Sequence, residues 1–440
     1  MRREQLIHLI PALKRWAKFI PTLRVEEHLR STELRSRTHM SVAEEEEKTF
    51  EVEIERLLPG GVGLAHAEGL TLFVSLAAPG DVLRVKIDRV AGKVGFASIV
   101  EVLKPSSVRV EPPCPYFGRC GGCDFQQLTY QAQLEAKAEI IRDCLHRIAK
   151  IEAPGAIRVT PSPNEWRYRT RANWQVDVPA KLLGYFERGS NQVCDVDYCA
   201  VLAPELEQAL EKIRHDLAAD TSVPLPRNIE AVFGDEGVSV APAIAGFRPD
   251  VIRRRVGNET YSFNADSFFQ VNQELIEPLI AEAMGNAQGQ FAVDLYCGVG
   301  LFTLPLARRF ARVTAVEEYP RATELARRNL AAAKLENVEV VTLDVADWLK
   351  HSRPFEPLDF LLLDPPRAGC ENAAIAGILA LRPRRIAYVS CDPATLARDL
   401  KKLIGDGAGG YTLDSVAAFD MFPQTHHVET VARLTATRQL

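Results

Sequence analysis

The sequence predicts a multidomain α/β protein that ends in a doubly wound, mostly parallel sheet. The chain has 440 residues, more than one hydrophobic core usually holds, so two or three domains are expected. From about residue 265 onward, apolar strands alternate with helical segments, as in strand–helix–strand units. Short alternating strands separated by glycines at 46–105 instead predict a small β-barrel. The strands expected in the C-terminal sheet are 292–296, 312–317, 338–343, 358–363, 385–389 and 430–434.

Composition and charge limit the kinds of partner that the chain can bind. The chain is 47% hydrophobic and 25% charged, and its formal net charge is -5. Contact with RNA or DNA would therefore need a local basic patch. No apolar run reaches the roughly eighteen residues of a membrane span, so no membrane contact is expected. Nothing in the sequence demands an obligate protein partner.

The cysteines are unevenly distributed along the chain. There are nine of them, and three fall within ten residues. In a large chain with an α/β pattern, this distribution favours metal binding and catalysis over disulfides. We therefore expect a reducing compartment and a cytoplasmic location.

Residues 1–45 are expected to form a disordered extension. Apolar and basic residues are mixed there, and Pro11 and Pro21 interrupt any long helix. A more conventional amino terminus begins at Met40, which is an alternative start. A weakly amphipathic targeting segment is a second alternative, although the stretch lacks the core of a signal peptide.

Residues 106–255 are expected to form a central α+β domain. Apolar residues at near-helical spacing predict a helix over 126–150, and its packing on the C-terminal domain is one possibility. The pattern then returns to strands, with one acidic helix near 204–218. The C-terminal domain is expected to span 256–440.

Cys114, Cys120 and Cys123 form a compact group, with five and then two residues between them. Glycines in this segment let the chain fold tightly around a metal ion or a cluster. Zinc takes four tetrahedral ligands, and iron–sulfur clusters usually take four thiolates, so a fourth cysteine is needed. We expect a metal centre here.

The fourth ligand is expected to be Cys199, with Cys194 and Cys144 as alternatives. Radical enzymes that use S-adenosylmethionine generally have three residues, rather than five, between the first two cysteines. The wider spacing favours a complete, structural [4Fe-4S] cluster. A zinc site is the alternative.

A glycine-rich loop at 294–300 (Asp-Leu-Tyr-Cys-Gly-Val-Gly) follows an apolar strand and precedes a helix that begins near Thr303. Its two glycines let the backbone approach a nucleotide-like ligand, whereas a dinucleotide fingerprint would place a third glycine at position 303. Glu317 ends the next strand, where its carboxylate could accept hydrogen bonds from both ribose hydroxyls. This ordered set resembles the motifs of Rossmann-like methyltransferases that bind S-adenosylmethionine.

Cys391 follows an expected strand that ends at Ser390, at the carboxyl edge of a parallel sheet, where open α/β folds bind ligands. Alone it is weak evidence, because buried free cysteines usually pack as small hydrophobes. Asp364 closes another strand, within 364–367 (Asp-Pro-Pro-Arg). Amino-group methyltransferases usually carry an aromatic residue where Arg367 stands. The sequence therefore favours methylation of carbon through a cysteine nucleophile.

Two resemblances cover most of the chain. Residues 46–105 resemble a TRAM domain, an OB-like RNA-binding barrel, on the strength of 61–65 (Gly-Val-Gly-Leu-Ala), 72–74 (Leu-Phe-Val) and 79–81 (Pro-Gly-Asp). From about residue 50 to 434 the chain resembles the RNA 5-methyluridine methyltransferases. The segments that carry this second resemblance are 268–272 (Phe-Phe-Gln-Val-Asn), 294–300, 364–367, 390–393 (Ser-Cys-Asp-Pro), 398–400 (Arg-Asp-Leu) and 420–429 (Asp-Met-Phe-Pro-Gln-Thr-His-His-Val-Glu).

The second resemblance implies roles for individual residues. Cys391 is implied to be the nucleophile and Glu429 the general base. Residues implied to contact S-adenosylmethionine are Gln270, Tyr296, Gly298, Glu317 and Asp364. Asp344, which ends the third expected strand, is placed either near the adenine or in solvent. Leu301 departs from some relatives, which have a polar residue there.

RNA contacts are expected outside the catalytic pair. The target base must leave its stack to reach the thiol, and Phe268 or Phe269 could stack on it or belong to the core. Arg167, Arg169 and Arg171 alternate, so a strand would place all three on one face, where they suit phosphate contacts.

The cluster and the TRAM domain together resemble the branch of the family that modifies 23S ribosomal RNA. We therefore expect S-adenosylmethionine-dependent formation of 5-methyluridine in 23S rRNA. Three alternatives are the same chemistry on tRNA, a noncatalytic RNA-binding or assembly factor, and a small-molecule methyltransferase.

Overall fold

The computed structural model describes residues 49–219, 225–244, 246–351, 357–405 and 410–437. The expected extension over 1–45 lies outside them. These residues form two compact units, one that ends at Ser107 and one that begins at Val108 and also contains Pro59–Gly61. Within the described ranges, no helix is long and apolar enough to cross a membrane.

The first unit is a single six-stranded sheet in the order β1-β5-β6-β4-β3-β2. Its side chains alternate between an apolar core and solvent, as the glycine-punctuated sequence predicts. Leu83 and Val85 of β5, for example, are fully buried against Leu72 and Val74 of β4. Its strands are β1 (Thr49–Glu53), β2 (Arg56–Leu58), β3 (Val62–Ala67), β4 (Leu70–Val74), β5 (Val82–Ala91) and β6 (Val94–Lys104).

The second unit is organised around an eight-stranded sheet in the order β17-β16-β15-β18-β19-β21-β20-β7. The strands from β17 to β19 are parallel to one another, whereas β21 is antiparallel to both of its neighbours. The expected mostly parallel sheet is therefore present. Its strands are β7 (Val159–Thr160), β15 (Gly289–Leu295), β16 (Phe310–Glu317), β17 (Val338–Thr342), β18 (Phe360–Leu363), β19 (Arg385–Ser390), β20 (Tyr411–Phe419) and β21 (Glu429–Ala436).

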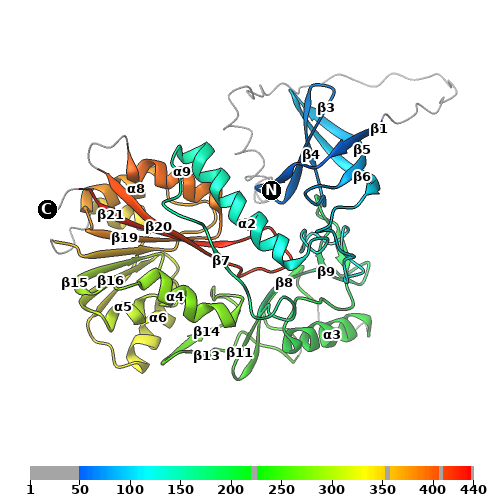
Figure 1. Ribbon diagram of the computed structural model, residues 1–440. Coiled ribbons are helices and arrows are strands. Elements are labelled where there is room, and N and C mark those ends of the chain that lie inside the picture. The colour runs from blue at the N-terminus through cyan, green and yellow to red at the C-terminus, as the bar shows by residue number, and fades with distance from the viewer. Residues whose placement is uncertain (1–48, 220–224, 245, 352–356, 406–409, 438–440) are drawn as a thin grey trace, which may run out of the picture. The chain divides into compact units, whose positions relative to one another are not determined.

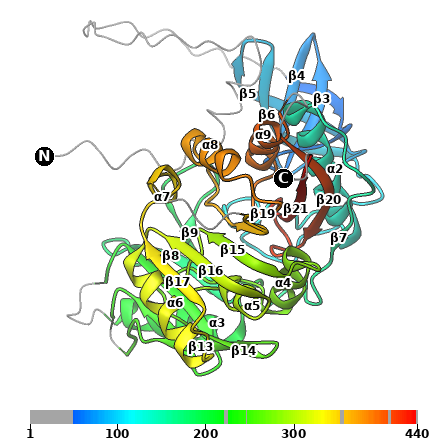
Figure 2. The same ribbon diagram turned by 90° about the vertical axis from the view of Figure 1, so that its left-hand side faces the viewer.

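Helices cover both faces of this sheet (Figures 1 and 2). One face carries α4 (Ile276–Met284), α5 (Thr303–Ala307) and α6 (Pro320–Ala332), and the other carries α7 (Val345–His351), α8 (Asn372–Leu381) and α9 (Pro393–Ile404). The helix α2 (Tyr130–Cys144), capped by Thr129, packs beside α9, and its chain continues through a π-helical turn to β7 at the sheet edge. Part of the expected central region therefore packs with the C-terminal sheet.

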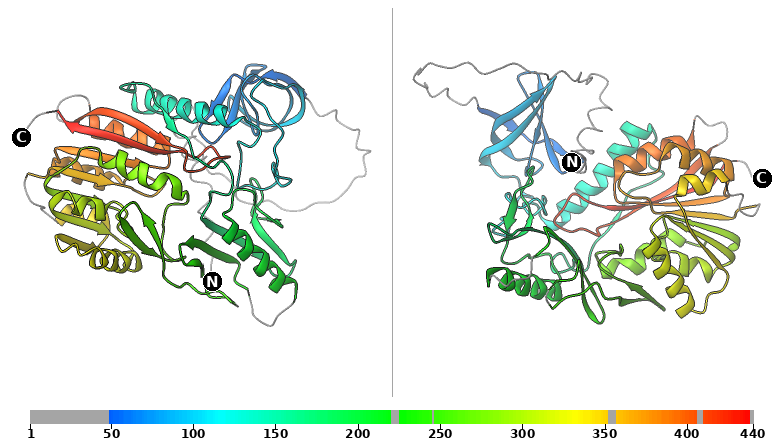
Figure 3. Two further views of the ribbon diagram at one scale, coloured as in Figure 1. Left: turned by 60° about the horizontal axis from the view of Figure 1, so that its bottom comes forward. Right: turned by 180° about the vertical axis from the view of Figure 1, so that it is seen from behind.

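A smaller five-stranded sheet, in the order β10-β9-β8-β11-β12, lies against α3 (Pro204–Ala218), seen in green in Figure 3. Trp174 and Leu183 of the sheet pack on Leu206 and Leu210 of the helix. The strands are β8 (Arg171–Asp177), β9 (Leu182–Phe186), β10 (Val193–Asp195), β11 (Asn228–Gly234) and β12 (Gly237–Ala241).

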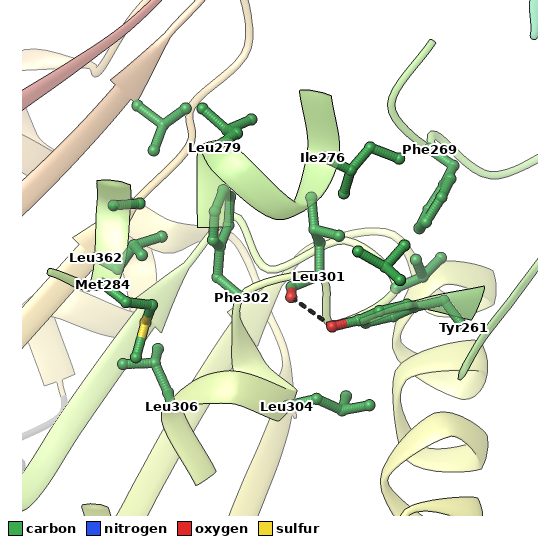
Figure 4. Close-up of a cluster of buried hydrophobic side chains, with 14 of the residues drawn as sticks. Tyr261, Phe269, Ile276, Leu279, Met284, Leu301, Phe302, Leu304, Leu306 and Leu362 are labelled. Carbon is green, nitrogen blue, oxygen red and sulfur yellow. Dashed lines mark hydrogen bonds between the residues drawn. The ribbon is translucent and has the colours of Figure 1, made fainter. Parts of the chain in front are cut away.

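A hairpin of β13 (Ile252–Val256) and β14 (Glu259–Phe263) joins the core of the large sheet. Phe263 stacks on Phe269, with ring centroids 4.3 Å apart. The hydroxyl of Tyr261 donates a 3.0 Å hydrogen bond to the carbonyl of Leu301, whose side chain is buried (Figure 4). Leu301 is therefore a packing residue here. The expected domain boundary at 255/256 cuts through this hairpin.

A buried ion pair joins α2 to the segment that precedes β21. The ammonium of Lys137 contacts the Asp420 carboxylate, both side chains are fully buried, and Lys137 also donates a 3.1 Å hydrogen bond to the carbonyl of Phe422. Gln133, one turn earlier, accepts a 2.9 Å hydrogen bond from the backbone N–H of Gln424. The helix thus fixes the chain that leads to Glu429.

Lys137→Met is expected to lower the free energy of unfolding by about 3–5 kcal/mol, because it leaves the Asp420 carboxylate buried without its cation. Chemical denaturation followed by fluorescence measures this loss. Lys350→Met is the matched control, since Lys350 pairs with Asp347 on the surface. Equal midpoints for the two variants would contradict the prediction.

Candidate functional site

Cys391 lies between the end of β19 and the first turn of α9, at the edge of the sheet where the parallel strands end. Asp392 caps the helix by accepting 2.9 Å hydrogen bonds from the N–H groups of Ala394 and Thr395. In the antiparallel pairing of β19 with β21, Ser390 faces Thr430. Continuing that register by one residue sets Cys391 opposite Glu429, the first residue of β21.

Buried charges define the environment of the Cys391 thiol. Burial, reinforced by the negative charge of Glu429 and opposed by the guanidinium of Arg367, raises the pKa of Cys391 to about 12. Burial and the nearby Asp364 raise the pKa of Glu429 well above its ordinary value, and burial raises the pKa of Asp364 to about 7. Cys391, Glu429, Asp364 and Arg367 therefore interact within one site. Its three acidic groups hold their protons more tightly than they would in water.

Arg367 also contacts the segment before Glu429. Its Nη2 lies 2.5 Å from Nδ1 and 2.7 Å from Nε2 of His427. Burial, followed by the positive charges of His426 and Arg367, lowers the pKa of His427 well below its ordinary value, so the ring is neutral. The sequence signal for Arg367 is its place where an aromatic residue is expected, whereas His427 lies within the 420–429 motif without an expected role of its own.

Residues of α9 and β19 anchor the loop from Arg367 to Cys370 through hydrogen bonds. The buried carboxylate of Asp399 accepts 2.8 Å hydrogen bonds from the N–H of Cys370 and from the hydroxyl of Tyr388. Arg398 donates a 3.0 Å hydrogen bond to the carbonyl of Ala368. The 398–400 motif was noted in the sequence without a role, and here it anchors the loop that follows Asp364.

Hydrogen bonds to the carboxylates of Asp294 and Glu317 hold the glycine-rich loop after β15 in place. Asp294 is fully buried and accepts a 2.5 Å hydrogen bond from the hydroxyl of Thr303, which explains the threonine in place of a third glycine. Burial raises the pKa of Asp294 to about 7. Glu317 accepts hydrogen bonds from the N–H groups of Gly298, at 3.1 Å, and Tyr319, at 2.9 Å.

Several features of this loop fit a nucleotide-like cofactor. Gly298 has φ +53°, and a Cβ placed there would meet nothing within 4 Å. Tyr296 adopts φ +62°, a conformation that is strained for a tyrosine. Gln270 is buried and its Oε1 has no hydrogen-bond partner among the described residues, which leaves an acceptor for a ligand donor.

Asp344 is exposed and caps α7 by accepting a 2.9 Å hydrogen bond from the N–H of Asp347. Its place after β17 still puts it at the same sheet edge as Glu317.

The four cysteines expected to bind metal line one cavity, together with Gln126 and Arg169. The alternative ligands, Cys144 in α2 and Cys194 in β10, are buried and do not line it. The cysteines that do so are Cys114, Cys120, Cys123 and Cys199.

The cysteine thiols of the cavity are partly buried. Burial raises the pKa of both Cys120 and Cys123 to about 12, so thiolates there need a stabilising cation or metal. The Nε of Arg169 has no hydrogen-bond partner within the described part of the chain, and Gly122 donates a 3.4 Å hydrogen bond to the Cys120 sulfur. No three His, Cys, Asp or Glu side chains in the described ranges are gathered closely enough to hold a single metal ion.

Comparisons with known proteins agree with this architecture. The family described as tRNA (Uracil-5-)-methyltransferase matches residues 250–437, and the TRAM domain matches residues 43–100. The 23S rRNA (uracil(1939)-C(5))-methyltransferase RlmD of Alkalilimnicola ehrlichii is 35% identical, over 87% of this chain and 96% of that protein. An uncharacterized RNA methyltransferase of Thermosynechococcus vestitus is 31% identical, over 88% of this chain and 98% of that protein.

The chain belongs to the S-adenosylmethionine-dependent RNA uracil-C5 methyltransferase family. A solved relative is the Pyrococcus abyssi tRNA (uracil-54, C5)-methyltransferase in complex with S-adenosyl-L-homocysteine. It has a TM-score of 0.68 and 25% identity, and it covers 87% of this chain and 100% of its own.

The expected arginine face is absent from this RNA uracil-C5 methyltransferase. Residues 161–170 are irregular, and only Arg171 lies in a strand, β8. Arg171 bonds to the carbonyls of Ser267 and Ala265 and to Glu230, so it holds the fold together. Arg169 lines the cysteine cavity, and Arg167 is exposed with φ +55°. The prediction of one shared face was wrong because the backbone between them turns.

Phe268 and Phe269 of the methyltransferase differ in solvent exposure. Phe268 is 60% exposed, whereas Phe269 is buried against Phe263. Phe268 therefore presents its ring to solvent, and Phe269 belongs to the core.

Proposed function

We propose that the protein methylates C5 of a uridine in 23S rRNA, with S-adenosylmethionine as the methyl donor. The observation that carries this proposal is the placement of Cys391 opposite Glu429, at the edge of the sheet that also holds Asp364 and the glycine-rich loop. A nucleophile and a base beside a methyl-donor site are the two groups that methylation of uracil C5 requires.

The first step is attack of the Cys391 thiolate on C6 of uracil. Uracil C5 is too poor a nucleophile to take a methyl group directly, but the new S–C6 bond pushes electron density onto C5 and O4. The positive charge of Arg367 favours the thiolate form of Cys391. S-adenosylmethionine, when bound, supplies an electrophilic methyl group on a sulfonium, and C5 accepts that group.

The second step restores the aromatic ring. Glu429 removes the proton that remains on C5, the electron pair of the C5–H bond forms the C5–C6 double bond, and the Cys391 sulfur leaves as thiolate. Covalent catalysis thus divides one difficult substitution into two easier steps. Glu429 is buried and lies opposite the nucleophile, which suits a base that acts on the same ring.

The residues that would hold the donor are those around the glycine-rich loop. Glu317 suits the ribose hydroxyls, and the free Oε1 of Gln270 and the backbone of Gly298 are further polar contacts. Tyr296 and Asp364 lie at the ends of neighbouring strands. Asp344 lies at the same edge and is placed near the adenine in this proposal.

We assign a [4Fe-4S] cluster to Cys114, Cys120, Cys123 and Cys199, in a structural role. The four thiols line one cavity, and in a cluster each binds a different iron, so they need not converge on a single ion. Anaerobically purified protein is expected to contain about four iron and four acid-labile sulfide per chain, as such a cluster requires. Cys199→Ser should lose both and Cys144→Ser should keep them. Zinc alone would refute the assignment.

The choice of 23S rRNA follows the more similar relatives. RlmD of Alkalilimnicola ehrlichii, at 35% identity, is named for 23S rRNA, whereas the solved tRNA enzyme is 25% identical. The decisive experiment incubates the protein with labelled S-adenosylmethionine and either 23S rRNA or tRNA, each lacking the modification, and maps the product. Label on C5 of a uridine in 23S rRNA supports the proposal. Label in tRNA alone would show that the substrate is tRNA, and label on adenine would contradict methylation of uracil C5.

Arg367→Gln is expected to slow formation of the covalent RNA adduct by roughly tenfold or more, because the loss of a nearby positive charge raises the pKa of Cys391. Adduct formation is measured on RNA that contains 5-fluorouridine. Since the pKa of Cys391 is about 12, the rate should rise with pH from 7 to 9 as thiolate forms. Arg367→Lys keeps the charge and should lose less. Equal rates for both variants and the parent enzyme would contradict this role.

A further inference from the structure

Asp124, the residue after Cys123, is hydrogen-bonded to the segment 420–429, which ends at Glu429. Asp124 follows Cys123, and its Oδ1 accepts a 2.7 Å hydrogen bond from the backbone N–H of His426. Its other carboxylate oxygen contacts Nδ1 of the same histidine. His426 is three positions before Glu429, so a side chain of the cysteine loop holds the chain beside the active site.

Backbone hydrogen bonds reinforce this connection. The N–H groups of Asp124 and Phe125 both donate to the carbonyl of Gln424, at 3.1 Å and 3.0 Å. Two consecutive donors on one carbonyl, together with the carboxylate on His426, fix both the position and the direction of the strand that follows. The Asp124 side chain is only 14% exposed, so solvent does not compete strongly for these bonds.

The start of the same segment is held by residues outside the cysteine loop. Lys137 holds Asp420, and the hydroxyl of Tyr168 donates a 2.9 Å hydrogen bond to the carbonyl of Pro423. These contacts lie at the start of the segment. Asp124 contacts its end, where His427 meets Arg367 and Glu429 begins β21. Loss of Asp124 should therefore loosen the end of the segment without releasing its start.

We propose that Asp124 is a positioning residue for Glu429, through which the cysteine loop determines the geometry of proton removal from C5. This inference rests on the proposed function, since it takes Glu429 as the base. The Cys391 thiol is carried by β19 and α9, outside the segment that Asp124 holds. Arg367, which favours the thiolate, lies on the loop that Asp399 and Arg398 anchor. Asp124 should affect elimination and leave formation of the covalent adduct nearly unchanged.

The principal test compares two rates in Asp124→Asn and in the parent enzyme. Turnover on RNA with ordinary uridine requires proton removal, and it is expected to fall by roughly 10- to 100-fold with little change in KM, as for a misplaced catalytic group. Adduct formation on 5-fluorouridine RNA stops before that step, because the fluorine cannot leave as a proton does, and it should change by less than about twofold. Unchanged turnover, or an equal loss in both rates, would overturn the proposal.

A second readout does not depend on catalysis. Amide hydrogen exchange of the peptide that spans 424–429 should quicken in Asp124→Asn at an unchanged iron content, while exchange in β19 stays constant. His426→Ala removes only the side-chain partner, so it should show a smaller change in the same direction, and it carries the test if Asp124→Asn does not fold. Unchanged exchange in both variants would overturn the proposal.

The chain supplies a matched control. His146 and Glu152 make a similar contact, with 2.6 Å between Nδ1 and Oε1, but both side chains are exposed. Glu152→Gln should leave turnover, adduct formation and exchange at 424–429 unchanged. If the parent enzyme forms no 5-methyluridine, the proposed function fails, and the exchange measurement still decides whether Asp124 holds the segment.

Discussion

Cys391→Ala is expected to abolish both methylation and the covalent RNA adduct, with turnover reduced by on the order of 10⁴-fold or more. The reason is chemical: without the thiolate, C5 of uracil never becomes electron-rich enough to take a methyl group. Methyl transfer from labelled S-adenosylmethionine to RNA measures turnover, and a denaturing gel detects the adduct.

Cys144→Ala is the control for this experiment, since Cys144 is a buried residue of α2 that does not line the cysteine cavity. It should retain turnover near that of the parent enzyme. Methylation that persists in Cys391→Ala would remove the nucleophile from the mechanism and leave Cys391 as a packing residue.

Glu429→Gln is expected to lower turnover by roughly 10²- to 10⁴-fold, the usual contribution of a general base. Its distinguishing result is accumulation of the adduct on ordinary uridine, because Cys391 can still attack C6 but the C5 proton is not removed. The pKa of Glu429 is raised by burial and by Asp364, so in the parent enzyme elimination should accelerate as pH rises and the carboxylate ionises.

Glu274→Gln is the matched control, because Glu274 is an exposed carboxylate in the 3-10 turn before α4. It should neither slow turnover nor trap RNA. A Glu429→Gln variant that loses turnover without accumulating adduct would place Glu429 before the attack step rather than after it.

Much of the candidate site could be predicted from the sequence, because its residues follow strands of a regular sheet. The parallel strands end at one edge, so Glu317, Asp364 and Cys391 are neighbours once the order of strands is known. The alternation of apolar strands and helices sets that order within a few arrangements. The expected strands agree with the observed ones to within a few residues.

Contacts between irregular segments could not be predicted in the same way. Arg167, Arg169 and Arg171 have the spacing of a strand face, but Arg169 is fixed by backbone bridges to Leu202 on one side and Asn272 on the other. Those partners are distant in sequence and override the local pattern. Asp124 and His426 are 302 positions apart, so no periodicity connects them. Phe268 and Phe269 are adjacent and identical, and only the packing of the hairpin determines which one is buried.

The antiparallel strand β21 has a consequence for biosynthesis. Among the described strands it comes last in the sequence, yet it lies inside the sheet, between β19 and β20. A nascent chain on the ribosome therefore exposes the thiol of Cys391 and the donor-binding loop before Glu429 has been synthesised. Insertion of β21 between its neighbours completes both the hydrogen-bonded sheet and the proposed catalytic pair of Cys391 and Glu429. On the proposed mechanism, the capacity for turnover therefore arises only at the final stage of folding.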